Sequence, residues 1–287
     1  MRIRDWTVQF SVLLLFGIGA YAAELRAPDH VKAGTTFTIT SSGSGGGTFY
    51  LFGPASAVKR KVDSGSEIAV QSEEVEHAGR YTAVLCGSEC TATHFYVQAA
   101  DPERLSFLVH PSRVPVDDPN AMSAVALVFD QFHNLIQQPQ SVTFSIIPKS
   151  GSAVTEERRS DQGIAWVRLS SGRREGPTKI AASVGKNDEE IRIVQQIASD
   201  ACNLRMRPEW VSNKFFVETD PVRDCSGNNV PDGTVVSFTM TDSNGKTTVD
   251  VPIKKGIAKV EMPISGSARI TVASGVVTGN ELNVAGR

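Results

Sequence analysis

The stretch that decides the fold runs Arg223-Asp224-Cys225-Ser226-Gly227-Asn228-Asn229-Val230-Pro231-Asp232-Gly233-Thr234-Val235-Val236-Ser237-Phe238. Its first half is rich in Asp, Asn and Gly, which favour turns because they bond to nearby backbone or tolerate a left-handed conformation. Its second half is β-branched, and Val236 and Phe238 stand two residues apart, so both point to one face of a strand. The stretch therefore predicts a tight turn that leads into a core strand.

A second copy of this pattern lies 94 residues earlier in the chain. The shared positions are Asp130, Asn134, Phe144 and Gly163 in the first copy and Asp224, Asn228, Phe238 and Gly256 in the second. Each glycine precedes an Ile-Ala-x-Val run, which opens a further strand. Because self-similarity at a fixed period indicates a repeated structural unit, the middle and last thirds of the chain are expected to share one fold.

Short strand-like runs fill the rest of the chain. They cover residues 35–40, 80–85, 93–97, 124–129, 141–146, 164–169, 234–240, 257–262 and 269–272. Turn residues separate these runs, and no long stretch after residue 22 has a helical period. This spacing predicts an all-β protein built from β-sandwiches or barrels.

The repeated motif resembles the bacterial immunoglobulin-like domains of the invasin and intimin repeat group. The resemblance covers residues 101–287 and is closest in the last third. The middle third departs from the pattern at Phe132-His133, which replace the usual small turn residues. The resemblance implies that these units act as stiff spacers or presenting modules of surface proteins. Fold analogy by itself does not assign an activity.

The first third, residues 23–99, is interpreted as a divergent sandwich of the same class. Val31–Phe37 resembles the opening strands of many bacterial immunoglobulin-like modules, and Gly79-Arg80-Tyr81 is similar to the tyrosine corner of such folds. With the resemblance, the expected organisation is a signal peptide at residues 1–22 followed by three tandem immunoglobulin-like β-sandwiches at 23–99, 100–198 and 199–287. The linkers between them are short, which favours a semi-rigid rod.

The first 22 residues have the layout of a secretory signal peptide. Arg2 and Arg4 are followed by an apolar run from Phe10 to Ala20 and by Ala20-Tyr21-Ala22, a small-x-small cleavage pattern. The alternative, a transmembrane anchor, needs a run of about 20 apolar residues, and this one is much shorter. We expect an exported chain, in the periplasm, at the cell surface or outside the cell, with no membrane span in its mature part.

Four cysteines follow the signal peptide, at Cys86, Cys90, Cys202 and Cys225. An even number in an exported chain predicts two disulfides, and four cysteines allow three pairings. The local pairing, Cys86 with Cys90 and Cys202 with Cys225, is favoured. The rival is a metal site at Cys86, Cys90 and His94. It is disfavoured because the surrounding sequence is strand-like and a fourth ligand is missing.

Composition and motifs point away from catalysis. The net charge of −2 in 287 residues argues against nucleic-acid binding. No serine-nucleophile elbow, zinc motif or phosphate loop is present, so no catalytic residue, cofactor or metal ligand is predicted. The acidic residues Asp117, Asp118, Asp200, Asp220 and Asp224 are interpreted as turn residues, because calcium needs closer clustering. Trp166 and Trp210 are expected to pack in a core.

These observations predict an exported, non-enzymatic structural or interaction protein of the cell envelope or surface. It would present a binding surface to a protein or surface-polymer partner, as adhesins do. The first domain is expected to hold the specificity because it is the least repetitive. Two alternatives stay open: a soluble periplasmic subunit of a larger envelope or secretion assembly, and an accessory protein of a polymer- or carbohydrate-acting enzyme.

Overall fold

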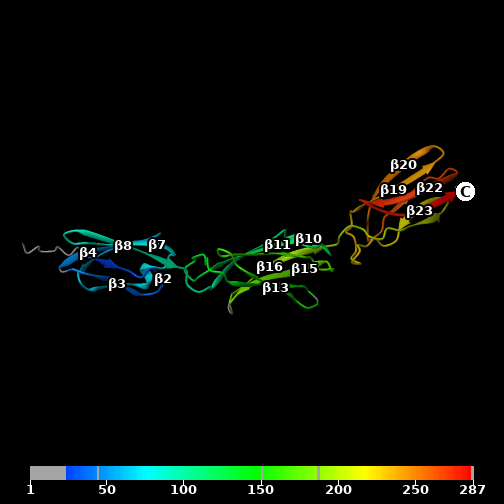
Figure 1. Cartoon of the computed structure of the whole chain (residues 1–287). Helices are drawn as coiled ribbons and strands as arrows, with labels where there is room; N and C mark the ends of the chain where they lie inside the picture. Colours follow the sequence, from blue (N-terminus) through cyan, green and yellow to red (C-terminus); the bar gives the residue numbers. More distant parts are fainter. Residues whose placement is uncertain (1–23, 44, 150, 186–187, 286–287) are drawn as a thin grey trace, which may run out of the picture. The chain divides into compact units, whose positions relative to one another are not determined.

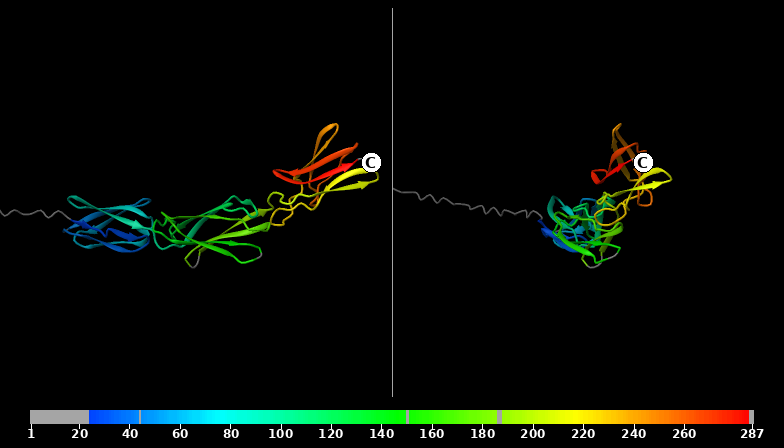
Figure 2. Two further views of the ribbon diagram at one scale, coloured as in Figure 1. Left: turned by 45° about the vertical axis from the view of Figure 1, so that its right-hand side comes forward. Right: turned by 90° about the vertical axis from the view of Figure 1, so that its right-hand side faces the viewer.

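The computed structural model describes residues 24–43, 45–149, 151–185 and 188–285. The predicted signal peptide lies outside these residues. The chain divides into two compact units, Met1–Ala100 and Asp101–Arg287. Figures 1 and 2 show that strands build both units, and the one helical element in the described part is the short 3-10 turn η1, Ser72–Glu74. The described residues include no helix that is long and apolar enough to cross a membrane.

The first unit is a β-sandwich. Its strands are β1 (Leu25–Arg26), β2 (His30–Lys32), β3 (Phe37–Ser41), β4 (Gly46–Phe52), β5 (Ala57–Asp63), β6 (Glu67–Val70), β7 (Gly79–Cys86) and β8 (Cys90–Gln98). They form sheets in the orders β1-β3-β6 and β2-β8-β7-β4-β5. The rings of Phe37 and Phe95, one from each sheet, lie 5.1 Å apart between centroids. Tyr81 is fully buried and donates its hydroxyl to the carbonyl oxygen of His77, as in a tyrosine corner.

The second unit opens with another sandwich. Its strands are β9 (Arg104–His110), β10 (Arg113–Pro115), β11 (Met122–Phe129), β12 (Ser141–Ile147), β13 (Val154–Arg159), β14 (Ile164–Leu169), β15 (Gly176–Val184) and β16 (Asp188–Ile197). They form sheets in the orders β14-β11-β9 and β10-β16-β15-β12-β13. Phe107 and Phe144 meet between the two sheets, with ring centroids 6.2 Å apart.

A third sandwich completes the second unit. Its strands are β17 (Met206–Val211), β18 (Lys214–Thr219), β19 (Val235–Asp242), β20 (Gly245–Pro252), β21 (Lys259–Glu261), β22 (Ser267–Ser274) and β23 (Val277–Ala285). The sheets run β17-β18-β21 and β20-β19-β22-β23. Phe215 and Val217 from the first sheet share one core with Phe238 and Ile270 from the second.

The predicted fold class is confirmed: the chain is all-β and consists of tandem β-sandwiches. Alternation explains why single strands could be recognised from sequence. In β14, for example, the residues from Ile164 to Leu169 alternate between exposed and buried along the whole strand. One face of such a strand supplies the core, and the opposite face remains available to solvent or to partners.

Candidate interaction surfaces

The two Asp-x-x-x-Asn motifs form the same turn. In the second sandwich the Oδ1 atom of Asp130 accepts the backbone N–H groups of Phe132 and Asn134 at 2.9 and 2.8 Å. In the third sandwich the Oδ1 atom of Asp224 accepts those of Ser226 and Asn228 at 2.9 and 2.8 Å. In each turn the Asn side chain also donates to the Asp carboxylate. The motif is therefore a turn lock that acts through an Asp side chain.

Both Asp residues of this lock are buried: Asp130 is completely buried, and Asp224 has only 3% of its surface exposed. Burial by itself would raise the pKa of Asp224. The hydrogen bonds from the side chain and backbone of Asn228, and from the backbone of Ser199 and Ser226, outweigh it and hold that pKa below its usual value. The carboxylate therefore stays charged inside the turn, which explains why a buried acid is tolerated there.

The third residue after each Asp adopts a left-handed backbone. In the third sandwich this residue is Gly227, with φ 87°, and in the second it is His133, with φ 65°. Glycine reaches this conformation without steric cost, whereas a residue with a Cβ atom does not. The departure at His133 noted in the sequence is therefore a strained position in the same turn.

The remaining motif residues belong to the core and its turns. Phe144 and Phe238 are fully buried in equivalent strands. Gly163 and Gly256 have φ 83° and 81°, and their carbonyl oxygens accept the backbone N–H groups of Val128 and Val222. At Gly163 a Cβ atom would stand 2.5 Å from the side chain of Leu135, so the position also needs the space.

The turn of the third sandwich also contacts the second sandwich. The Asn228 side chain donates to the carbonyl oxygen of Arg173 at 2.9 Å, and its oxygen accepts the backbone N–H of Glu175 at 3.2 Å. Beside it, the Ser226 hydroxyl donates to the carboxylate of Asp117 at 3.1 Å. The predicted turn residue thus makes contacts between sandwiches as well as contacts within its own turn.

The cysteines form two disulfides, Cys86–Cys90 and Cys202–Cys225, which is the local pairing favoured from the sequence. Cys86 and Cys90 stand opposite each other where β7 turns into β8. Cys225 follows Asp224 directly, so its disulfide ties the turn lock to the segment that enters the third sandwich. No group of three or more His, Cys, Asp or Glu side chains among the described residues is arranged to hold a metal ion.

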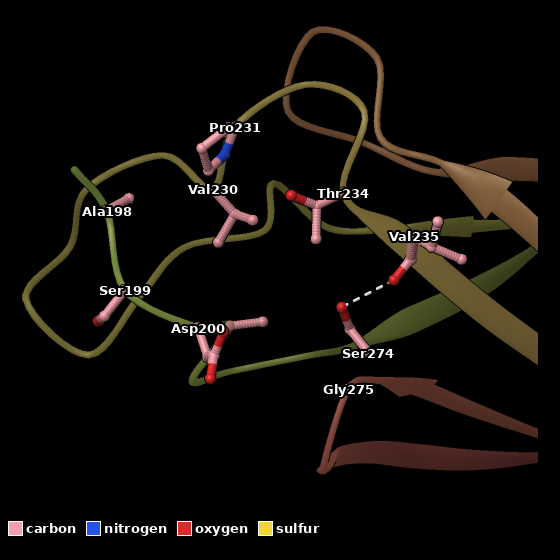
Figure 3. A pocket seen from close by; sticks show the side chains of 10 residues that line it. Ala198, Ser199, Asp200, Val230, Pro231, Thr234, Val235, Ser274 and Gly275 are labelled. Atoms are coloured by element: carbon pink, nitrogen blue, oxygen red, sulfur yellow. Dashed lines mark hydrogen bonds between the residues drawn. The ribbon is translucent and has the colours of Figure 1, made fainter. Parts of the chain in front are cut away.

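A hollow of about 390 Å³ lies beside this entering segment (Figure 3). Its walls include Ala198, Ser199 and Asp200 on one side and Ser274 with Gly275 on the other. The Ser274 hydroxyl donates to the carbonyl oxygen of Val235 at 2.9 Å, as the dashed line shows. Asp200 is the only titratable side chain among its lining residues, so the hollow holds no pair for acid–base chemistry.

The first sandwich has an outer face rich in aromatic and basic side chains, on the sheet β2-β8-β7-β4-β5. Tyr50 and Phe52 follow each other on β4, with ring planes 4° apart and centroids 6.1 Å apart. Tyr96 on β8 lies opposite Arg80 on β7, and its ring stacks with His30 at 5.8 Å. Phe52 and Tyr96 are 47% and 50% exposed, which is high for aromatic side chains.

Cations flank these rings. Lys59 on β5 lies opposite Tyr50, and its ammonium group is 5.6 Å from the centre of that ring. The set formed by Tyr50, Phe52, Lys59, Arg80, His94 and Tyr96 is called the aromatic–basic face below.

Few carboxylates lie on the side of the sheet that carries the aromatic–basic face. Asp63, at the far end of β5, is the only acidic residue that the five strands place on this side of the sheet. Glu89 lies in the hairpin loop at that same end. Other acidic residues of the sandwich gather in and after β6, at Glu67, Glu73, Glu74 and Glu76. On this side of the sheet the strands therefore place more basic side chains, among them Lys59, Lys61 and Arg80, than acidic ones.

The second and third sandwiches differ in one equivalent row of side chains. Trp166 and Lys259 are each the third residue after the glycine described above. In the second sandwich the row reads Trp166, Val125 and Leu108 across β14, β11 and β9. In the third it reads Lys259, Glu218 and Arg207 across β21, β18 and β17.

The third sandwich fills this row with ion pairs. The Glu218 carboxylate accepts a hydrogen bond from the Arg207 guanidinium at 2.9 Å and forms an ion pair with the Lys259 ammonium at 3.2 Å. The hydrogen bond from Arg207, assisted by Lys259, lowers the pKa of Glu218 below its usual value. The outer surface of β17-β18-β21 therefore carries charged side chains that pair with one another.

The second sandwich leaves the same row apolar. Trp166 is 62% exposed and Leu108 63% exposed. The prediction that Trp166 packs in a core is therefore wrong, because its strand directs Ala165 and Val167 inward instead. Trp210 is partly buried and packs edge-on against Phe215 at 5.0 Å, at the border of the third core.

Sequence reasoning did not identify the aromatic–basic face. The alternation of Tyr50 with Phe52 and of Lys59 with Lys61 was visible, and each pair shares one face of its own strand. The pairing of β4 with β5 was not visible, because it depends on a hairpin whose register the sequence leaves open.

No protein-family profile matches the sequence, and no characterised protein matches it. Solved structures do. The chain is similar to FdeC, an Escherichia coli adhesin, with a TM-score of 0.62 and 14% identity over 92% of this chain and 96% of that one. It is similar to InvD of Yersinia pseudotuberculosis, with a TM-score of 0.50 and 12% identity over 91% and 96% of the two chains.

A third similar structure is invasin, a bacterial integrin-binding protein, with a TM-score of 0.46 and 12% identity over 92% of this chain and 59% of that one. At such identities the comparisons with FdeC and InvD establish the fold. They agree with the resemblance to invasin-type immunoglobulin-like domains inferred from the repeated motif.

Proposed function

We propose that the protein is an exported, non-enzymatic adhesion-type protein, and that its first sandwich holds the binding surface. The observation that carries this proposal is the aromatic–basic face. Exposed aromatic rings beside cations are enriched where proteins meet partners, because they offer large contact areas and charge in one place. A face that only needed to be soluble would carry mixed charges instead, as the surface of β17-β18-β21 does.

Export is supported by the signal-peptide pattern and by the two disulfides, since disulfides persist in oxidising compartments. A non-enzymatic function is supported by the share of the chain that the sandwiches occupy. Strands of the three sandwiches extend from Leu25 to Ala285, and the functional features described above are turns and surfaces.

The strands of the three sandwiches lie within residues 25–98, 104–197 and 206–285, which supports the proposed domains at 23–99, 100–198 and 199–287. The contacts of Asn228 with Arg173 and Glu175 support the proposal that the second and third domains act as one presenting piece.

The proposal is tested with the tagged full chain in two steps. Cells that produce it are separated into periplasm, outer membrane and medium, and the purified protein is then added to epithelial and bacterial cells. We expect recovery at the surface or in the medium and saturable binding to cells. Recovery only in the periplasm, without cell binding, would instead favour an accessory subunit of an envelope assembly.

Two variants locate the binding surface. Phe52→Ala combined with Tyr96→Ala removes both exposed rings of the aromatic–basic face, and cell binding is expected to fall. Val276→Ser is the matched control, because Val276 is 93% exposed on the third sandwich. Equal binding by both variants would place the binding surface elsewhere.

A further inference from the structure

We propose that the aromatic–basic face binds an acidic polysaccharide, a polymer whose repeat carries a carboxylate or a sulfate. This inference rests on the proposed function and names the ligand class of the same surface. The face combines stacking platforms with cations, and such a polymer combines apolar ring faces with regularly spaced negative charges.

The stacking platform is formed by Tyr50 and Phe52. Their rings are nearly parallel, as the 4° angle between their planes requires, and they sit side by side on one strand. The faces of pyranose rings expose C–H groups that pack on aromatic rings, so a platform of this kind suits consecutive sugars. Tyr96 adds a third ring two strands away, and the Tyr hydroxyls can bond to sugar hydroxyls.

The cations stand at both borders of this platform. Lys59 lies beside Tyr50 on the edge strand β5, and Arg80 lies beside Tyr96 on β7. Lys59 and Arg80 are both exposed, so each can pair with a carboxylate or sulfate without breaking the core. His94 on β8, opposite Thr82, bonds to the Thr82 hydroxyl at 2.9 Å and adds a polar ring on the far side of β7 from the platform.

The distribution of acids favours this ligand over nucleic acid. Asp63 and Glu89 close one end of the face, and the whole chain has a net charge of −2. A duplex of nucleic acid carries a dense charge over its whole length and would be repelled by that end. A polysaccharide with one charge per repeat can place its anions at Lys59 and Arg80 and its apolar ring faces on the rings between them.

The experiment measures the binding of the full chain to four probes: polygalacturonate fragments, heparin fragments, neutral dextran and poly-glutamate. We expect the two acidic polysaccharides to bind, and dextran and poly-glutamate to bind at least about tenfold more weakly, because each lacks one of the two features. Binding should weaken when salt is raised from about 50 to 150 mM, because exposed charges are screened.

Variants separate the two features. Phe52→Ala should weaken polysaccharide binding about fivefold or more while leaving its salt dependence unchanged. Lys59→Gln with Arg80→Gln should weaken binding and flatten the salt dependence. Lys179→Gln, on β15 of the second sandwich, is the charge control and should bind normally. Thermal unfolding shows whether each variant remains folded, which is expected because these side chains are exposed.

The inference is overturned if neither acidic polysaccharide binds, if poly-glutamate or duplex DNA binds as well as they do, or if Phe52→Ala has no effect on their binding. These outcomes are distinguishable from failure of the proposed function. Cell binding that depends on Phe52 and Tyr96 but is not inhibited by either polysaccharide would retain the adhesion proposal and reject this ligand. Polysaccharide binding without cell binding would do the reverse.

Discussion

The side-chain amide of Asn228 donates a hydrogen bond to the backbone carbonyl oxygen of Arg173, 2.9 Å away, and so joins the third sandwich to the second. The same amide donates to the carboxylate of Asp224 at 2.9 Å. One side chain therefore closes a turn and connects two sandwiches. Because the acceptor is a backbone atom, the contact depends on the position of the loop and is independent of the Arg173 side chain.

Replacing Asn228 with Ala is expected to loosen the connection between the second and third sandwiches. Hydrogen bonds to the charged Asp224 are lost as well, so the third sandwich should lose about 1–3 kcal/mol of unfolding free energy. Relative motion is measured by NMR relaxation or by fluorescence energy transfer between the two sandwiches. Asn134→Ala is the matched control, because it removes the equivalent turn bonds without touching the contact with Arg173. Equal relative motion in both variants would contradict the prediction.

The third sandwich is expected to lose stability in acid through Asp224. Its pKa is lowered in the folded state from an ordinary value of 3.8. Stability from this group is therefore fully present above that ordinary value and is lost as the pH falls through the lower, folded pKa. Unfolding followed by denaturant at a series of pH values measures this. Asp224→Asn should be less stable at neutral pH and should lack this part of the acid dependence; an unchanged pH profile would count against it.

The left-handed positions of the two turns predict opposite effects of exchanged residues. His133→Gly should stabilise the second sandwich by up to about 1 kcal/mol, because it removes a strained backbone conformation. Gly227→His should destabilise the third sandwich by about 1–2 kcal/mol for the same reason. His133 also contacts Arg104 at 3.3 Å, so Arg104→Ala reports the value of that contact separately. A destabilising His133→Gly would show that the side chain matters more than the strain.

The two disulfides should differ in their effect on stability. Cys202–Cys225 spans 23 residues and Cys86–Cys90 only 4. Chain entropy predicts a loss of about 3 kcal/mol for Cys202→Ser with Cys225→Ser and about 2 kcal/mol for Cys86→Ser with Cys90→Ser. Chemical denaturation of each double variant measures both values. A greater loss for the short loop would show that packing at the hairpin, and not loop closure, dominates.

Replacing the apolar row of the second sandwich with the charged row of the third should change the surface of the second sandwich with little effect on its stability. The variant Trp166→Lys, Val125→Glu, Leu108→Arg copies the ion-paired row of the third sandwich. Because Trp166 and Leu108 are mostly exposed, their replacement should change the unfolding free energy by about 0.5 kcal/mol or less each. Binding of an apolar dye and retention on a hydrophobic column should both fall. Unchanged retention would mean that other side chains form the apolar surface.

Local sequence determined much of this protein. Turn residues such as Asp224 and Asn228 identified the repeated turn because their side chains bond to backbone only two to four residues away. The hairpin disulfide Cys86–Cys90 was predictable because its two cysteines are also only four residues apart. The strands were recognised because alternation is a property of a single segment.

The tertiary structure alone decided which residues became neighbours across strands and which face met the core. Trp166 illustrates the limit. Alternation shows that its side chain points to the opposite face from those of Ala165 and Val167, but it does not show which of the two faces meets the core. The pairing of Lys59 with Tyr50 and the contact of Asn228 with Arg173 join residues whose separation in sequence carries no signal. Such rows and junctions arise from strand register and from the meeting of sandwiches, which the packing of the whole chain sets.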